Sequence, residues 1–278
     1  MVADAAAFPR LRRSSVISHF ALAAATDAVA QAGLTAEQLN RTVLVFASSD
    51  GGVIYTRRFY ADIVERGEGM GSPLLFPETV YNAPASHIAA RLGLQGESVT
   101  LVGDAAAGFQ ALEAGCEFLA AGEADFCLVC AAQELDWVTC DAYQRWRKLE
   151  GATEGAPFSE GAAAIILSHD TKGCQLEPLS EKSMGNITLA PSLHVSSASG
   201  TNLDTIERQG IRNLSTDIKT IRPKYALGES FACTAIQQVI VGALTLQQRP
   251  EESGVLVSTV GFDRQTSALF LTEANRWA

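Results

Sequence analysis

The sequence lacks any apolar run of the roughly 18 residues that a membrane-spanning helix needs, because charged residues interrupt each candidate segment. We therefore expect no membrane span and no membrane partner. The chain of 278 residues is long enough to bury a sizeable core. Its composition, 47% hydrophobic and 19% charged, is typical of a globular protein rather than a disordered one.

Positive charge is also scarce. The 21 lysines and arginines are outnumbered by 31 aspartates and glutamates, which gives a formal net charge of -10 and an isoelectric point near 4.9. Affinity for nucleic acid comes largely from basic side chains that neutralise phosphates, so we expect no DNA or RNA partner. The same charge argues against direct docking of another acidic protein, such as an acyl carrier protein. A more basic partner would have to supply that surface.

A secretory leader is missing as well, and the six cysteines lie in apolar runs, so we interpret them as buried, reduced thiols of a cytoplasmic protein. Cys127 and Cys130 have the spacing of a redox or metal motif. They lie inside a strand-like run, however, and no second pair follows at a suitable distance. The pattern predicts packed core thiols, with no metal and no cofactor. The six are Cys116, Cys127, Cys130, Cys140, Cys174 and Cys233.

Helix-like and strand-like segments alternate along the chain, with crossovers of about twenty residues that are typical of parallel βαβ units. Residues 170–174 resemble a turn, after which the pattern repeats more briefly. The sequence thus predicts two related α/β halves, residues 1–171 and residues 172–278. The expected helices are 20–33, 55–70, 83–92, 105–121 and 233–247, and the expected strands are 42–47, 98–102, 126–132, 162–168, 187–190, 254–260 and 268–272.

Several segments, taken in order, resemble the β-ketoacyl synthases of the thiolase superfamily. The resemblance implies a thiolase-like αβαβα sandwich of two similar halves, with abbreviated N-terminal strands and an abbreviated C-terminal half. In the first half it is carried by residues 20–25, 82–96 and 121–125, by Gln133 and Glu134, and by the Pro-Phe and Glu-Gly-Ala sequence within residues 156–167. In the second half it is carried by Ala198-Ser-Gly-Thr201, by Lys224 with Gly228, and by Gly261-Phe262.

The residues that would carry the family's chemistry are missing. Condensation needs a thiolate at the start of a helix, where backbone N–H groups and the helix dipole lower its pKa and hold an oxyanion. The resemblance puts Ala105 at that position, and a methyl group cannot attack a thioester. The two histidines that serve decarboxylation correspond to Ser199 and Glu229, and a carboxylate would repel the developing enolate. Lys224 is retained, and we interpret it as a structural ion-pair partner, so no catalytic residue is predicted.

Two further side chains remain as candidates for altered chemistry. Asp104 precedes the helix start, where capping and the dipole stabilise a carboxylate by about 0.5–2 kcal/mol and make it a poorer base. A shift of one residue in the correspondence would instead place it at the nucleophile position. Of the four histidines, only His194, five residues before Ser199, merits a test as a general base. The sequence has no Gly-x-Ser-x-Gly elbow, P-loop or zinc-ligand cluster.

Two classes of function follow. In the first, the chain resembles the chain-length factors, and it pairs as a non-catalytic partner with an active ketosynthase in polyketide, aryl-polyene or fatty-acid assembly. Pairing would use the strand at residues 98–102, either with that ketosynthase or with a second copy, and an acyl carrier protein would dock through the partner. In the second, the chain is an enzyme of altered chemistry that hydrolyses or decarboxylates thioesters with Asp104, His194 or Lys224. A homodimer that binds acyl chains without turnover is a third possibility.

Overall fold

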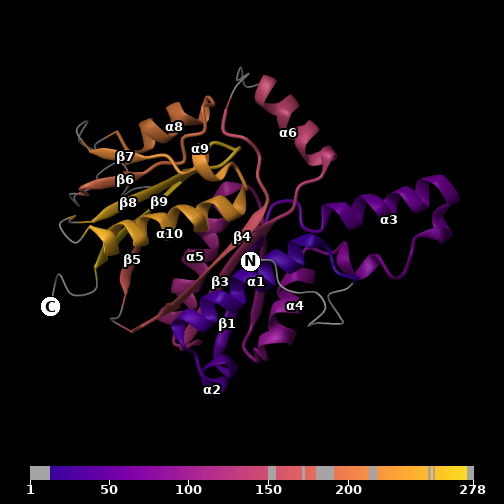
Figure 1. Cartoon of the computed structure of the whole chain (residues 1–278), viewed down its shortest axis with the longest axis horizontal. Helices are drawn as coiled ribbons and strands as arrows, with labels where there is room; N and C mark the ends of the chain where they lie inside the picture. Colours follow the sequence, from indigo (N-terminus) through magenta and orange to yellow (C-terminus); the bar gives the residue numbers. More distant parts are fainter. Residues whose placement is uncertain are drawn as a thin grey trace.

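The computed structural model describes residues 13–149, 155–170, 173–179, 191–212, 218–249, 252 and 254–273. These residues form two β-sheets, with two helices packed between them and further helices on their outer faces (Figure 1). The layers alternate helix, sheet, helix, sheet and helix, which confirms the predicted α/β sandwich.

The first sheet has its strands in the order β2-β1-β3-β4. β1 (Thr42–Ser48) is parallel to β2 (Ser98–Val102) and to β3 (Phe126–Gln133), whereas β4 (Gly161–Ser168) is antiparallel to β3. β1 and β3 are continuous apolar runs because helices cover both faces of the sheet there. The strands predicted in the first half are all confirmed, and β2 and β4 are the two edges.

The second sheet has the order β5-β9-β8-β6-β7. The strands predicted at 254–260 and 268–272 are confirmed as β8 and β9, but the predicted turn over 170–174 is wrong at its end, because Cys174 begins a strand. The predicted strand at 187–190 lies outside the described residues. The strands of this sheet are β5 (Cys174–Leu179), β6 (Leu193–Val195), β7 (Lys219–Ile221), β8 (Val255–Val260) and β9 (Thr266–Glu273).

The central layer consists of α5 (Ala105–Ala120) and α10 (Ala232–Gln248), which lie side by side between the sheets (Figure 1). Small residues allow their close approach. A Cβ atom on Gly108 would lie far inside contact distance of the Ala232 carbonyl oxygen. Because inward-facing strand residues pack on both helices, the two sheets share one hydrophobic core.

The outer layers use the alternate residues of the strands. Leu44 and Phe46 of β1 point away from the central helices and pack with α1 (Val16–Ala32) and α4 (Ala83–Leu92). On the second sheet, α8 (Leu203–Gly210) packs against β8 and β9. The helix predicted at 20–33 is confirmed as α1, and Gly33 is its left-handed C-cap. The helix predicted at 83–92 is confirmed as α4.

An arm projects from the first half between β1 and α4 (Figure 1). It contains α3 (Val53–Arg66) and the short helices η3 (Glu68–Met70) and η4 (Phe76–Glu78), so the helix predicted at 55–70 ends earlier than expected. Four α-helices in the described ranges were not predicted: α2 (Ala36–Asn40), α6 (Trp137–Leu149), α8 and α9 (Lys224–Leu227).

The six cysteines are all free. Cys127, Cys130 and Cys233 are fully buried, and burial raises the pKa of Cys127 and of Cys233 to about 12. Cys127 and Cys130 lie on opposite faces of β3, in the two core clusters. None of the helices in the described ranges combines the length and the apolar character that a membrane crossing requires. The predicted boundary at 171/172 stays a prediction, although β4 belongs to the first sheet and β5 to the second.

The contact between the central helices can be tested at Gly108. We expect Gly108→Ala to lower the free energy of unfolding by about 1–3 kcal/mol, because the new methyl group meets backbone that cannot move aside. Urea denaturation measures the change. Gly69→Ala is the matched control, since a Cβ atom there meets nothing within 4 Å. Equal stabilities of the two variants would contradict the close approach.

Candidate functional site

Four segments from both halves of the chain meet at one end of the central helices. They are the start of α5, the loop after β6, the stretch from α9 to the start of α10, and the loop between β8 and β9. Ala105, Ser199, Lys224 and Glu229 line one small cavity there. The structure thus brings together the three positions that the resemblance predicts to be altered, Ala105, Ser199 and Glu229, and the lysine that it predicts to be retained. The cavity volume is about 10 Å³, which is scarcely room for one water molecule.

Ala105 is the first residue of α5, and its side chain is buried. The start of a helix can stabilise an anion or a thiolate. Here the N–H of Ala106 donates to Asp104 Oδ1 at 2.9 Å, and the N–H of Ala107 donates to the Asp104 carbonyl at 3.0 Å. The side chain of Ala105 itself is a methyl group. None of the six cysteines, all of which the structure describes, lines the cavity.

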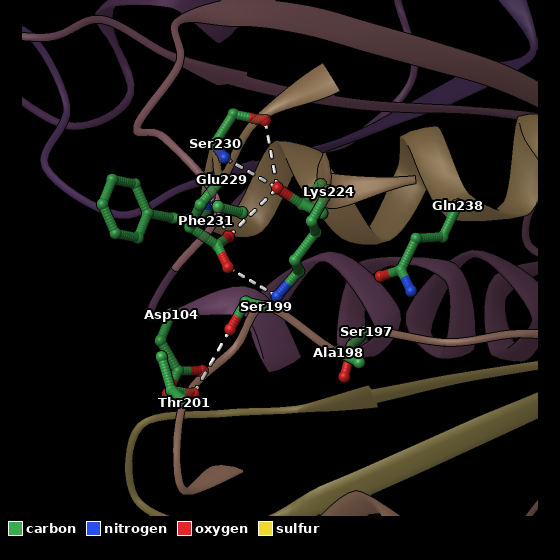
Figure 2. A network of polar contacts seen from close by, with 12 residues as sticks. Asp104, Ser197, Ala198, Ser199, Thr201, Lys224, Glu229, Ser230, Phe231 and Gln238 are labelled. Carbon is green, nitrogen blue, oxygen red and sulfur yellow. Dashed lines mark hydrogen bonds and ion pairs between the residues drawn. The ribbon is translucent and has the colours of Figure 1, made fainter. Parts of the chain in front are cut away.

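Lys224 and Glu229 form a buried ion pair, with 2.5 Å between Lys224 Nζ and Glu229 Oε2 (Figure 2). The other carboxylate oxygen, Oε1, accepts hydrogen bonds from the backbone N–H of Phe231 at 2.9 Å and from Thr234 Oγ1 at 3.1 Å. A buried charge pair is tolerated only when its remaining hydrogen-bonding groups are satisfied in this way. The predicted structural role of Lys224 agrees with this geometry.

Ser199 stands beside this pair in the loop that follows β6 (Figure 2). Its hydroxyl lies 3.3 Å from Thr201 Oγ1, and its backbone N–H donates to Asp204 Oδ1 at 2.9 Å. Its carbonyl accepts from the N–H of Ala156 at 2.7 Å. A hydroxyl in this setting cannot replace an imidazole as a donor that changes its protonation state near neutral pH.

Aromatic side chains close the site. Phe231 stacks on Tyr143 with ring centroids 4.2 Å apart, and Phe262 and Phe158 pack against the same pair. The Arg147 guanidinium lies 4.0 Å above the Phe158 ring and donates to the Ala156 carbonyl at 2.7 Å. Burial raises the pKa of the Tyr143 hydroxyl and lowers the pKa of Arg147.

The residues of α6 were missed in the sequence analysis. The signal was present, because Tyr143, Trp146 and Arg147 are spaced to lie on one face of a helix. Because that helix was not predicted, the sequence analysis did not predict that aromatic rings cover the cavity.

Phe231 has an unusual backbone conformation, with φ 52° and ψ -122° at the residue before α10. For a bulky residue this is strained, and such strain persists only where surrounding contacts impose it. The hydrogen bond from its N–H to Glu229 and the stacking on Tyr143 are those contacts.

Asp104 caps α5, as predicted. Its Oδ1 accepts from the N–H of Ala106 at 2.9 Å, and its Oδ2 accepts a short hydrogen bond from the N–H of Phe262. Gln265 donates to the same carboxylate at 3.2 Å. These contacts tie the loop between β8 and β9 to the start of α5, which leaves the carboxylate engaged on both oxygens.

His194 belongs to a different cluster, on the face of the second sheet that α8 covers. Its Nε2 lies 2.8 Å from Ser258 Oγ, and Ser258 Oγ donates to Glu207 Oε1 at 2.5 Å. Glu207 also accepts from Ser196 Oγ at 2.6 Å. Burial lowers the pKa of His194, an effect that the nearby Glu207 opposes. His194 therefore interacts with Ser258 and Glu207 rather than with Asp104 or Lys224.

More than half of the chain, residues 4–172, matches the sequence model of one family, described as "Beta-ketoacyl synthase, N-terminal domain". The chain belongs to the β-ketoacyl synthase family. That Ala105, Ser199 and Glu229 replace the family's catalytic residues stays a prediction of the sequence resemblance. No curated protein matches the sequence.

Solved structures share the fold over nearly the whole chain. One is a type II polyketide synthase acyl-carrier protein in complex with its ketosynthase bound to the hexaketide, with a TM-score of 0.78, 17% identity, and coverage of 97% of this chain and 88% of that chain. Another is the ishigamide ketosynthase/chain length factor, with a TM-score of 0.76, 16% identity, and coverage of 94% and 81%. A β-ketoacyl synthase from Burkholderia phymatum has a TM-score of 0.77, 14% identity, and coverage of 96% and 84%.

The buried ion pair can be tested by a double-mutant cycle. We expect Lys224→Met to lower the free energy of unfolding by about 3–5 kcal/mol, because it leaves the Glu229 carboxylate buried without its cation. The double variant Lys224→Met/Glu229→Gln should recover most of that loss, since the amide oxygen can still accept from Phe231 and Thr234. Urea denaturation of the wild type, Lys224→Met, Glu229→Gln and the double variant completes the cycle. A double variant as unstable as the single one would refute the structural reading of Lys224.

The His194 cluster predicts a pH dependence. The pKa of His194 is lowered in the folded state, so the unfolded chain, with an ordinary histidine pKa of about 6.5, takes up the proton first as the pH falls. His194 should therefore make stability decrease below about pH 6.5, by at most about 1.4 kcal/mol per pH unit. We expect the stability difference between the wild type and His194→Gln to shrink from pH 7.5 to pH 5.5. A constant difference would show that no proton uptake is linked to this residue.

Proposed function

We propose that this chain is a catalytically inactive β-ketoacyl synthase homologue that pairs with an active ketosynthase and supports it. The single observation that carries the proposal is the site cavity, in which a methyl group, a hydroxyl and a neutralised Lys224–Glu229 pair stand together under a cover of aromatic rings. Ser199, Lys224 and Glu229 each have a partner within the protein. These three side chains are therefore already engaged.

Each step of condensation lacks the catalytic side chain that it requires. Ala105 cannot form the acyl thioester. The six cysteines cannot replace it, because none of them lines the cavity. Glu229 would repel the enolate that decarboxylation generates, and Lys224 is engaged in neutralising Glu229. The cavity of about 10 Å³ also excludes an acyl chain or a pantetheine arm. The same volume disfavours a homodimer that binds acyl chains at this site.

The edge strand β2 supports pairing with a second thiolase-fold subunit. Among the described residues only β1 pairs with β2, so the outer N–H and C=O groups of the strand are available to another strand. Its end residue Val102 is 52% exposed. Two such edges can join antiparallel across a two-fold axis and extend the sheet through both subunits.

Apolar side chains continue this surface. Gly51, after β1, packs against Tyr81, and Gly103, after β2, donates to the Ser48 carbonyl, so the ends of both strands lie beside the arm. The Arg57–Asp136 ion pair joins α3 to the start of α6. Exposed apolar side chains on the arm and beside it are typical of a protein interface. They are Tyr60, Val64, Met70, Leu74, Phe76, Val80, Tyr81, Val102, Trp137 and Val138.

The chemistry of the partner follows from charge. With a net charge of -10, this chain is a poor dock for an acidic acyl carrier protein, so the active subunit would receive the carrier. Polyketide assembly is favoured over aryl-polyene or fatty-acid assembly, because one similar structure is described as a type II polyketide synthase complex and another as a ketosynthase/chain length factor. A cytoplasmic location accords with six cysteines that form no disulfide.

The enzyme of altered chemistry stays the competing hypothesis, and the geometry gives it little support. Asp104 is engaged as a cap, Lys224 is paired with Glu229, and His194 is buried in a separate cluster. Incubation with acyl- and malonyl-thioesters tests it directly. Turnover that Asp104→Ala abolishes would overturn the non-catalytic proposal.

The partner role is tested by co-expression with the ketosynthase encoded beside this gene. We expect a 1:1 complex on size exclusion, and we expect Val102→Asp to weaken it at least about tenfold, because a charge at the edge strand opposes strand pairing. Ala30→Asp, on the exposed side of α1, is the control and should leave the complex intact. A monodisperse protein of 29.5 kDa that ignores every such ketosynthase would contradict the proposal.

A further inference from the structure

Asp50 carries a carboxylate that no cation neutralises among the described residues. It lies in the loop after β1, and its side chain is half-buried. None of the ion pairs formed within the described ranges includes it. Burial raises the pKa of Asp50, and hydrogen bonding from Gln133 and Thr139 opposes this shift only in part. A carboxylate that is partly removed from water without a counterion is unfavourable, so its charge requires an explanation.

The surrounding structure makes no use of this charge. Gln133 Nε2 donates to Asp50 Oδ2 at 2.8 Å, and the oxygen of an asparagine could accept the same hydrogen bond. The start of α6 close by has its own carboxylate, because Asp136 accepts from the N–H of Val138 at 3.1 Å and pairs with Arg57.

The position of the Asp50 carboxylate is nevertheless fixed. Gln133 is fully buried, and its amide is turned so that Nε2 faces Asp50 while its Oε1 has no hydrogen-bond partner in the described part of the protein. An unpaired buried oxygen is unfavourable, and this one accompanies the orientation that holds Asp50. The carboxylate is therefore held in place as an acceptor, with its charge unused.

Asp50 lies beside the edge at which pairing is proposed. Val102, at the end of β2, is in register with Ser48, two residues before Asp50. The ring of Tyr81 lies against Gly51, the residue after Asp50. Tyr81 is 46% exposed and Val102 is 52% exposed. A charged group among exposed apolar side chains is typical of the part of an interface that loses its water on binding.

We propose that Asp50 receives an arginine or lysine side chain of the active ketosynthase subunit when the two proteins pair. Asp50 has this role only if that pairing occurs, so the inference rests on the proposed function and adds the chemistry that the partner must present. A subunit with an apolar or acidic residue at this place would leave the carboxylate buried and unpaired, so Asp50 also selects among partners. A second copy of this chain suits the role poorly, because two chains of net charge -10 repel each other.

Asp50→Asn tests the inference in the complex with the ketosynthase encoded beside this gene. We expect the dissociation constant to rise by about tenfold or more, because asparagine keeps the hydrogen bond from Gln133 but leaves the partner's cation unpaired. Asp50→Arg should weaken the complex further, since two cations would then repel each other. Titration of the separately purified subunits, followed by fluorescence anisotropy, measures both changes.

Asp170→Asn is the matched control. Asp170 is exposed and follows β4, and the end of β4 pairs with the start of β3, whereas Gln133 is at the end of β3. The control therefore removes the same charge at the opposite end of the first sheet. It should change the dissociation constant by less than about twofold.

Urea denaturation of the isolated chain distinguishes a partner's cation from one within this chain. Asp50→Asn should leave the stability unchanged or raise it, because it removes a half-buried charge and keeps the acceptor. A clear loss of stability would show that a cation of this chain pairs with Asp50, and it would overturn the inference. A dimer of the isolated chain that Asp50→Asn disrupts would overturn it as well, because the partner would then be a second copy.

The complex with the wild type separates this inference from the proposed function. A wild-type complex that Asp50→Asn leaves at full affinity would overturn the role of Asp50 alone. The absence of any complex with the wild type would overturn the proposed function and the role of Asp50 together.

Discussion

The backbone of α5 touches the start of α10 at Gly108, where no side chain separates the two helices. This contact sets the distance between the helix starts, and therefore between Ala105 and the segment that carries Glu229 and Phe231. The same helices fill the space between the sheets and provide the inner face of each with its core. Site and core are consequently built on one contact, and a change in the helix spacing would disturb both.

The residues of the site are packed like those of the hydrophobic core between the two sheets. A catalytic centre keeps groups that are unpaired, accessible and poised to change protonation state. Here the carboxylate of Glu229 has a cation and two donors, Asp104 holds the neighbouring loop, and the rings of Tyr143 and Phe231 occupy the approach. The groups at this place are used for packing and pairing within the protein, which accords with the proposed non-catalytic role.

Much of this could be predicted from the sequence. The long apolar strands β1 and β3 and the capped helices α1 and α4 have strong local signals. Two of the three positions predicted to be altered, Ser199 and Glu229, could be assigned because they lie in or beside recognisable motifs, Ala198-Ser-Gly-Thr201 and Lys224 with Gly228. The short strands β6 and β7, with three residues each, show no periodicity to detect. The partners of Lys224 and Asp104 depend on tertiary packing, which brings residues 104 and 262 into contact although 158 positions separate them. No local pattern encodes such a contact.

The shared central layer has a consequence for how the chain unfolds. α10, from the second half, packs on β3 and β4 of the first, and Asp104 anchors a loop of the second half to a helix of the first. Either half excised by itself would expose the apolar face that the other now covers, at about 25 cal/mol for each Å² laid open. We therefore expect the two halves to unfold as one cooperative unit rather than as two independent domains.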